Sequence, residues 1–350
     1  MIFKIGKKKI SETSKVYFIA DIAANHDGDL KRAKKLIKLA AQSGADAVKF
    51  QHFKAETIVS DYGFNMRGKE DHQAKWKKSV FEIYKNASLN IKWTKSLFEE
   101  SKKNKIDFMT APYDLNYVDD VYKYICAYKI GSGDLNWREL LVKISKKNKP
   151  VFLATGASSI DEVVRSVKLI QKYNKKIVLM QCNTNYTYED KNYDFINLNV
   201  IKSYKKKFKD NVILGLSDHT KGHATVLGSV ALGTRVIEKH FTDNNNRKGP
   251  DHYFSMNPKA WSEMVEQTRI LERSLGDGIK KIEKNEILTN FIQRRGSYAK
   301  KEIKKNTLIN KDDIIFLRPN FHGSISPFSG KKTFGKSNKK ILKGQFVFSR

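Results

Sequence analysis

Eight short apolar runs, most of them separated by amphipathic segments, are the feature that most restricts how this chain can fold. The runs are rich in β-branched residues and nearly continuous in apolarity, which is typical of parallel strands buried on both faces. Helical patterns such as 29–44 and 159–173 lie between them. This alternation favours a closed α/β barrel, the (β/α)8 TIM barrel, although the spacing alone leaves an open doubly wound sheet as an alternative. The runs are VYFIADIA (16–23), ADAVKF (45–50), IDFMTA (106–111), YICAYKI (124–130), PVFLAT (150–155), KIVLMQC (176–182), NVILGLS (211–217) and TRVIEKH (234–240).

Two segments depart from this repeat. Residues 51–90 form an excursion that is too long for an ordinary loop between a strand and a helix. Because loops at the carboxyl ends of barrel strands carry the chemistry, we expect this segment to act as a lid or a substrate loop. Near the other end of the chain, short strand-like pieces follow a polar stretch. We therefore predict a barrel domain over 1–277, a linker over 278–293 and a small domain over 294–350, whose marginal core should dock on another surface.

The formal net charge is +30, from 67 Lys and Arg residues against 37 Asp and Glu residues. Such a balance can indicate nucleic acid, an anionic membrane or an anionic small substrate as the partner. The basic residues are spread along the whole chain, so we interpret most of them as solvated faces, and no nucleic-acid-binding motif occurs. No run of about 18 apolar residues is present, so no membrane span is predicted.

The two cysteines, Cys126 and Cys182, both fall in apolar runs that we interpret as strands. They provide no disulfide framework, which indicates a reducing compartment. The N-terminal ten residues lack the apolar stretch of a signal peptide. A cytoplasmic protein is therefore expected.

Three lysines, Lys49, Lys129 and Lys239, lie inside otherwise apolar strands. An unpaired ammonium group is costly there, although a lysine near a strand end can extend its charged head out to water. Burying cations at this position makes sense if a phosphate or carboxylate arrives to pair with them. Other polar residues at or just beyond the strand ends are Asp21, Gln51, Thr110, Ser132, Asp134, Tyr186 and Ser217.

Two histidines, His219 and His240, end neighbouring strands. Two imidazoles on one rim form a reasonable pair of ligands for a divalent metal, but each could equally be a hydrogen-bonded structural side chain. The segment RKGPDHYFSM (247–256) adds Asp251 and His252 after the eighth strand.

Several ordered motifs make the chain similar to the bacterial sialic acid (nonulosonate) synthases over nearly its whole length. The C-terminal segment RRGSYAKKEIKKNTLINKDDIIFLRPN resembles the antifreeze-like (SAF) domain of that family. The barrel motifs that carry the resemblance are IADIAANHDGDL, GADAVKFQHFKAE, YKIGSGDL, LATGAS, GLSDHTKGHA, VIEKHFT and GPDHYFSMNP.

The resemblance implies a condensation of phosphoenolpyruvate with the aldehyde of an N-acylated mannosamine-type sugar, which releases phosphate. It implies that His219 and His240 bind a divalent metal, with Mn2+ the usual ion and Mg2+ or Co2+ as alternatives. By the same match, phosphoenolpyruvate is contacted by Lys49, Lys129 and Ser217, with Gln51, Thr110 and Ser132 nearby, while Tyr186 and Asp251 contact the sugar. Asp21, Asp134, His219 and His240 are the implied catalytic residues.

The SAF domain implies a domain-swapped homodimer, in which Arg318 reaches the sugar of the neighbouring subunit. Two residues depart from the family pattern, because Asp21 and Asp134 stand where the family usually has Glu. Both side chains are one methylene shorter, and both belong to the sugar half of the site. We therefore expect an acceptor sugar, or an acceptor geometry, that differs from plain N-acetylmannosamine.

Three alternatives stay open at this point. The first is another phosphoenolpyruvate-dependent aldol-type synthase with a phosphorylated sugar, for which Arg67 and Lys69 could supply the extra cations. A second is a non-catalytic basic protein that binds nucleic acid or anionic glycans in a salt-sensitive manner. The third is an inactive synthase in which the two Asp substitutions have abolished turnover.

Overall fold

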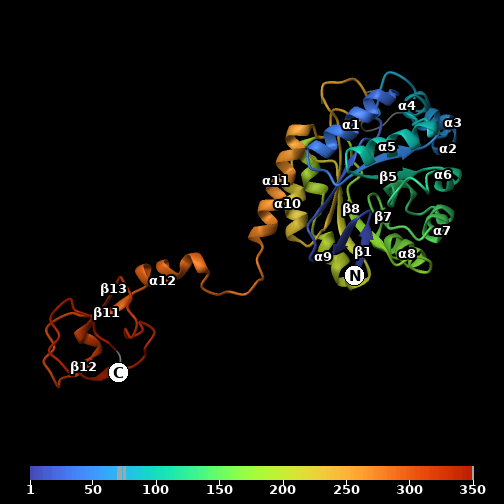
Figure 1. Ribbon diagram of the computed structural model, residues 1–350. Coiled ribbons are helices and arrows are strands. Elements are labelled where there is room, and N and C mark those ends of the chain that lie inside the picture. The colour runs from blue at the N-terminus through green and yellow to red at the C-terminus, as the bar shows by residue number, and fades with distance from the viewer. Residues whose placement is uncertain (69–72, 74–75, 349–350) are drawn as a thin grey trace. The chain divides into compact units, whose positions relative to one another are not determined.

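The computed structural model describes residues 1–68, 73 and 76–348. Eight parallel strands close into a barrel in the order β10-β3-β4-β5-β6-β7-β8-β9 (Figure 1). Closure confirms the (β/α)8 barrel and excludes the open sheet. The strands are β3 (Tyr17–Asp21), β4 (Ala47–His52), β5 (Asp107–Pro112), β6 (Tyr128–Ile130), β7 (Val151–Ala154), β8 (Ile177–Cys182), β9 (Ile213–Asp218) and β10 (Val236–His240).

Successive side chains along each strand point to opposite faces of the barrel wall, so the core has two layers. Side chains such as Phe18 and Leu153 point outward and pack against the surrounding helices. Their neighbours Ile19 and Phe152 belong to a second cluster inside the barrel. This period of two explains why the strands are apolar on both faces.

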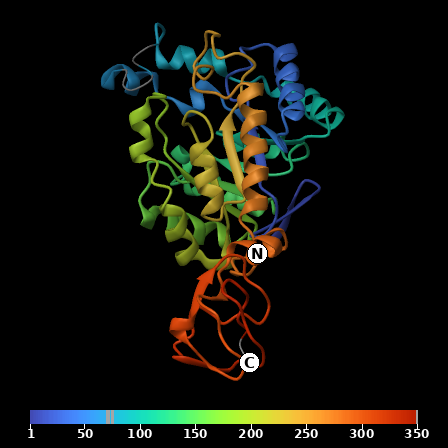
Figure 2. The same ribbon diagram turned by 90° about the vertical axis from the view of Figure 1, so that its left-hand side faces the viewer.

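Helices cover the outside of the barrel, and α10 and α11 lie side by side there (Figure 2). None of the described helices is long and apolar enough to cross a membrane. The helices that alternate with the strands are α1 (Leu30–Gln42), α5 (Thr94–Lys103), α6 (Leu115–Asp120), α7 (Arg138–Lys146), α8 (Ile160–Gln171), α9 (Val200–Phe208), α10 (Ala224–Ala231) and α11 (Pro258–Ser274).

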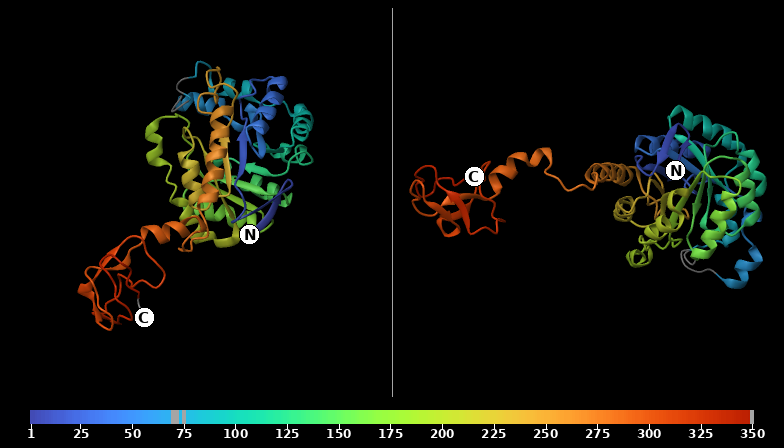
Figure 3. Two further views of the ribbon diagram at one scale, coloured as in Figure 1. Left: turned by 60° about the vertical axis from the view of Figure 1, so that its left-hand side comes forward. Right: turned by 90° about the horizontal axis from the view of Figure 1, so that it is seen from below.

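An N-terminal hairpin, which the pattern of apolar runs does not predict, closes one end of the barrel. Its strands β1 (Ile2–Ile5) and β2 (Lys8–Ser11) pair antiparallel. The apolar side chains of Phe3, Ile5 and Ile10 join the cluster inside the barrel. The ribbon of the hairpin lies at one end of the barrel (Figure 3, right). Water is therefore kept from that end, and the opposite end is left for the site.

The described residues of the excursion after β4 include the short helices α2 (Ala55–Ile58), α3 (Asp61–Arg67) and α4 (Val80–Ala87). They lie at the end of the barrel opposite the hairpin (Figure 1). Helix α4 begins with a capping box between Ser79 and Glu82, which fixes its start. Lys69 lies outside the described residues.

The chain divides into two compact units, 1–276 and 277–350. The second unit contains α12 (Ile287–Gln293), so the segment expected to be a plain linker includes a helix. Its strands pair as β11 (Gly296–Ala299) with β13 (Ile314–Leu317) and as β12 (Leu308–Asn310) with β14 (Thr333–Lys336). A small cluster that includes Ile303, Ile341 and Val347 forms its core. Cys126, which was expected in a strand, precedes β6 instead.

Candidate active site

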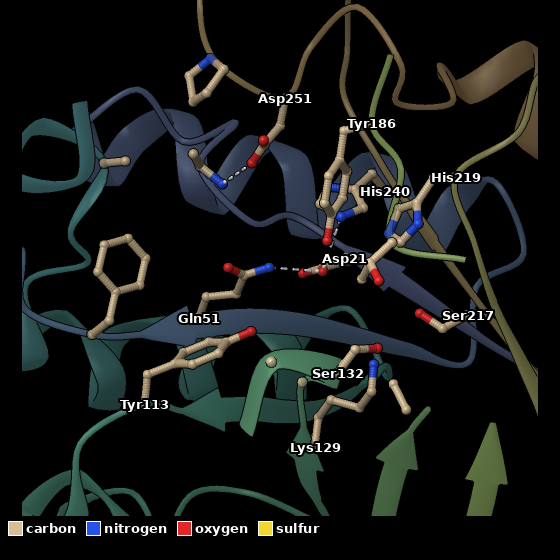
Figure 4. Close-up of a pocket in the computed structure, with 18 of the residues that line it drawn as sticks. Asp21, Gln51, Tyr113, Lys129, Ser132, Tyr186, Ser217, His219, His240 and Asp251 are labelled. Atoms are coloured by element: carbon tan, nitrogen blue, oxygen red, sulfur yellow. Dashed lines mark hydrogen bonds and ion pairs between the residues drawn. The ribbon is translucent and has the colours of Figure 1, made fainter. Parts of the chain in front are cut away.

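A cavity of about 450 Å³ opens at the carboxyl ends of the barrel strands. Strand-end side chains from β3, β4, β6, β9 and β10 point into it, with residues from the α2–α4 segment and the loop after β10 (Figure 4). Barrel enzymes carry their chemistry at this end because the carboxyl ends of all eight strands meet there.

The floor of this cavity consists of two lysines and two carboxylates. Lys49 Nζ lies 2.8 Å from Asp21 Oδ2 and 3.1 Å from Glu238 Oε1. Lys129 Nζ lies 2.5 Å from the same Glu238 oxygen, which also accepts a hydrogen bond of 3.1 Å from Ser217 Oγ. Three donors from three strands therefore converge on one carboxylate oxygen, while Glu238 Oε2 is buried without a hydrogen-bond partner.

The pKa values on the floor follow from this pairing. Burial alone would lower the pKa of Lys49, but Asp21 and Glu238 raise it above its usual value. Burial lowers the pKa of Lys129, and Glu238 opposes that effect. Burial would raise the pKa of Glu238, but Lys129 and Lys49 hold it well below its usual range. Lys49 and Glu238 are thus charged at neutral pH, and the floor is poised to exchange a carboxylate for an incoming anion.

Lys239 does not belong to the floor. Its ammonium group pairs with Asp218 and donates a hydrogen bond of 2.7 Å to the Thr220 carbonyl, outside the cavity lining. Of the three strand lysines considered as anion-binding candidates, Lys49 and Lys129 line the cavity and Lys239 does not. The period of two explains this, because Glu238 and His240 face inward and the residue between them faces out.

The two histidines lie together on one side of the cavity, with ring centroids 5.4 Å apart. His219 Nδ1 lies 2.9 Å from the Asn183 carbonyl and so carries a proton. Burial would lower the pKa of His219, but Cys182 and the Asn183 carbonyl raise it above its usual value. His240 Nδ1 is buried without a partner, and its Nε2 lies 3.6 Å from Asp21 Oδ2. Burial lowers the pKa of His240 to about 3, so this imidazole is neutral and can bind a cation. The Tyr186 ring packs on His219, with centroids 4.4 Å apart.

Two further carboxyl groups, Asp134 and Asp251, line the cavity near Tyr84. Burial raises the pKa of Asp134 to about 6, and its Oδ2 has no hydrogen-bond partner. Burial also raises the pKa of Asp251 to about 6, although the hydrogen bond from Ala24 N opposes this shift. Groups that titrate this close to neutrality can exchange protons with a substrate.

An aromatic and aliphatic wall faces these carboxyl groups. Most of it comes from the excursion after β4, which confirms that this segment borders the pocket. The wall is made of Phe53, Ile58, Trp76, Ile83, Tyr84, Ala87, Tyr113 and Pro250.

Most of the residues proposed from the sequence line this one cavity. Thr110 does not, because its hydroxyl donates to the Phe50 carbonyl at 2.8 Å and contacts His52 on the outer side of β5. Arg318 belongs to the second unit. The residues that do line the cavity are Asp21, Lys49, Gln51, Lys129, Ser132, Asp134, Tyr186, Ser217, His219, His240 and Asp251.

Sequence reasoning assigned no role to Glu238 or Tyr113. Glu238 could have been found, since it lies two residues before His240 on the same strand and so must share its face. Tyr113 approaches Gly131 so closely that a Cβ atom there would lie 2.8 Å from the Tyr113 hydroxyl. That contact joins segments after two different strands and leaves no trace in the local sequence.

Comparison with known proteins places this site in a family. Residues 36–280 match the model of the NeuB family. The N,N'-diacetyllegionaminic acid synthase of Campylobacter jejuni is 38% identical over 87% of this chain and 91% of its own. The pseudaminic acid synthase of the same species is 32% identical over 94% of each chain.

A solved structure agrees with these sequence relatives. The N-acetylneuraminic acid synthetase of Leptospira borgpetersenii, in complex with citrate, matches with a TM-score of 0.71 and 28% identity. The match covers 83% of this chain and 95% of that one. The chain therefore belongs to the NeuB family, the family of the nonulosonate synthases.

Proposed function

We propose that this chain is a nonulosonate synthase, a transferase that joins phosphoenolpyruvate to the aldehyde of an N-acyl-mannosamine-type sugar. The new bond links C3 of phosphoenolpyruvate to the aldehyde carbon. Water adds at C2, and the bond from C2 to the bridging phosphate oxygen then breaks, so that inorganic phosphate leaves with this oxygen and a nine-carbon 2-keto acid is formed. The observation that carries the proposal is the pair of buried lysines, Lys49 and Lys129, on the floor of the cavity.

Phosphoenolpyruvate fits this floor because it presents a carboxylate and a phosphate to fixed cations. Ser217 adds a hydroxyl donor beside the lysines, and Gln51 and Ser132 lie along the same lining. An anion bound here would replace Glu238 as partner of Lys129. The carboxylates that hold the lysines in the free protein thus prepare them for a substrate that carries the same charge.

The same site suits a divalent metal, with Mn2+ our first candidate and Mg2+ or Co2+ as alternatives. His219 and His240 would supply imidazole nitrogens, of which the His240 ring is neutral at pH 7, and Asp21 adds a nearby oxygen. Among the described residues, no three His, Cys, Asp or Glu side chains form a ready metal cluster, so water or substrate would complete the coordination. When bound, such an ion would polarise the aldehyde oxygen as a Lewis acid.

The sugar would occupy the space between the wall and the carboxyl groups of Asp134 and Asp251. Asp251 and Tyr186 are the proposed sugar contacts, and Asp134 lies on the same side. Asp21, although shorter than Glu, still reaches Lys49 and accepts a hydrogen bond of 3.0 Å from Gln51. These contacts argue against an inactive synthase. The apolar wall favours an acceptor with acyl or deoxy groups at its far end.

A phosphorylated acceptor is the weaker alternative. Among the described lining residues, Lys49 and Lys129 are the two that carry a Lys or Arg charge, and both belong to the floor. Arg67 is exposed on α3 and is not part of the lining. A phosphate at the far end of the sugar would instead meet Asp134 and Asp251, which would repel it.

The second unit, proposed as the antifreeze-like domain, would close the site of the neighbouring subunit in a homodimer through Arg318. Closure of this kind would exclude bulk water from the reacting atoms. We further propose a cytoplasmic enzyme of cell-surface polysaccharide biosynthesis.

Phosphate release from phosphoenolpyruvate tests the function. The purified chain is incubated with Mn2+ and a panel of amino-sugar aldehydes, phosphorylated and not, and the product mass is determined. Metal-dependent release with a nine-carbon keto acid as product is expected. No release with any acceptor would overturn the proposal, and release with phosphorylated sugars alone would favour the alternative.

A further inference from the structure

Asp251 reaches the cavity from an irregular loop, not from a strand. The loop runs from β10 to α11 and contacts the loop between β3 and α1. Asp251 itself is held by the Ala24 amide, which donates to its Oδ2 at 3.0 Å. Asn25 Nδ2 also donates to Ser255 Oγ at 2.8 Å, and Ser255 Oγ donates to the Asp251 carbonyl at 2.6 Å, so several contacts share in setting the position of this loop.

His252, the next residue, is fully buried and hydrogen-bonded through both ring nitrogens. Its Nε2 lies 2.9 Å from Asp27 Oδ1, and its Nδ1 lies 2.7 Å from Thr242 Oγ1. Because a carboxylate only accepts, Nε2 carries the proton and donates to Asp27, and Nδ1 accepts from the Thr242 hydroxyl. Thr242 and His252 belong to the loop after β10, whereas Asp27 belongs to the loop after β3. The imidazole therefore joins the two loops.

Asp27 is itself held in place. Arg32 Nε lies 3.0 Å and Arg247 lies 2.9 Å from its second oxygen, Oδ2. Its backbone has φ of +52°, a left-handed conformation that Asn and Asp tolerate better than most residues. The close packing extends to Gly249, where a Cβ atom would lie 2.6 Å from the His252 ring.

We propose that His252 is a positioning residue for the acceptor sugar. Its hydrogen bond to Asp27 locks the loop after β10, and the lock holds Asp251 at the cavity. His252 touches neither the cavity nor the floor, so it acts on the sugar half of the site alone. The role assigned to Asp251 rests on the proposed function, whereas the lock itself does not.

Two substitutions separate the contacts of the ring. In His252→Gln the side-chain amide reaches the position of Nε2 and can still donate to Asp27. In His252→Asn the shorter amide reaches the position of Nδ1, so it keeps the contact with Thr242 and loses Asp27. The two variants are matched in polarity and differ in which loop they hold.

The steady-state constants of both variants are measured for each substrate. For His252→Asn we expect the acceptor KM to rise about tenfold, the size expected on losing a charge-assisted hydrogen bond, with the phosphoenolpyruvate KM within about twofold of wild type. His252→Gln should be closer to wild type. An acceptor KM that rises equally in both variants would show a merely structural role and overturn the proposal. Equal rises of the acceptor KM and the phosphoenolpyruvate KM in His252→Asn would do the same.

A substrate-free measurement keeps the lock testable apart from the reaction. Amide hydrogen exchange over residues 247–256 should be faster in His252→Asn than in His252→Gln and wild type. If wild type proves inactive while exchange follows this pattern, the proposed function fails and the lock stands. Unchanged exchange in His252→Asn would refute the lock.

Discussion

The floor and the wall of the cavity differ in chemical character and in the elements that supply them. The floor is a network of charged and polar groups. Glu238 Oε1 accepts hydrogen bonds from Lys49, Lys129 and Ser217, and each of these donors belongs to a barrel strand. The wall is apolar and aromatic, and it comes mostly from the excursion 51–90 and the loop after β10. The carboxyl groups beside the wall, Asp134 and Asp251, lack cationic partners among the described residues.

Under the proposed function, this contrast would assign the two substrates to different parts of the fold. The strands would hold the groups that meet the anionic substrate, because charges must be placed accurately to be effective. The loops, which tolerate substitution, would hold the groups that meet the sugar. Changes on the floor should therefore affect turnover or folding broadly, and changes on the wall should affect the acceptor alone.

The largest effect is expected for His240→Ala, at the boundary between the two regions. Loss of this nitrogen donor should lower Mn2+-dependent phosphate release by more than about 100-fold. Mutating a residue that only hydrogen-bonds to a metal ligand already lowers metal affinity or activity by about 10- to 100-fold. Metal affinity measured by titration should fall with it. His223→Ala, outside the cavity lining, is the control; full activity in His240→Ala would remove the metal assignment.

Glu238→Gln should have the next largest effect, on stability. Neutralising Glu238 leaves Lys129 without its carboxylate partner, and breaking a buried ion pair costs about 3–5 kcal/mol. The thermal midpoint should drop, and added phosphate should restore more of it in the variant than in wild type, because an anion can take the empty place. If phosphate stabilises both proteins equally, anions do not bind on this floor.

Asp134→Asn should show a pH-dependent trade-off. The pKa of Asp134 rises from 3.8 to about 6 on folding, so its contribution to stability is present below about pH 4 and is lost as the pH rises through about 6. At about pH 7.5 the variant should therefore gain about 1 to 2 kcal/mol of stability relative to wild type, and this gain should vanish at about pH 4. Turnover should fall about 100-fold if Asp134 transfers a proton. Denaturant unfolding at both pH values checks the first part.

Tyr84→Ala should affect the wall alone. Removing this ring should raise the acceptor KM about tenfold through lost apolar contact and leave the phosphoenolpyruvate KM unchanged. Tyr62→Ala, an exposed tyrosine in the same excursion, is the matched control. An equal rise in both KM values would mean that wall and floor are not independent.

The smallest effect is expected for Arg67→Gln. Arg67 is exposed and lies outside the cavity lining, so kcat/KM for an unphosphorylated acceptor should change less than about twofold. A loss of about tenfold with a phosphorylated acceptor would instead revive the phosphorylated-sugar alternative.

The local sequence determined the eight strands, favoured a closed barrel and identified the two lysines of the floor. Each strand run carries its own apolar signal, and polar residues at strand ends must meet at one rim once the sheet closes. Sequence order alone therefore predicts that Lys49, Lys129, His219 and His240 lie together, and all four line the cavity. Motif resemblance added Tyr186 and Asp251, which the structure also places at the cavity.

Only the tertiary structure decided how these groups are paired. Glu238 binds lysines that are 189 and 109 residues away along the chain, and no local pattern reports such a distance. Thr110 faces away from the cavity, and the N-terminal hairpin fills the other end of the barrel. Periodicity reports which face of an element is buried, but the partner that buries it is chosen by packing and charge pairing between segments far apart in sequence.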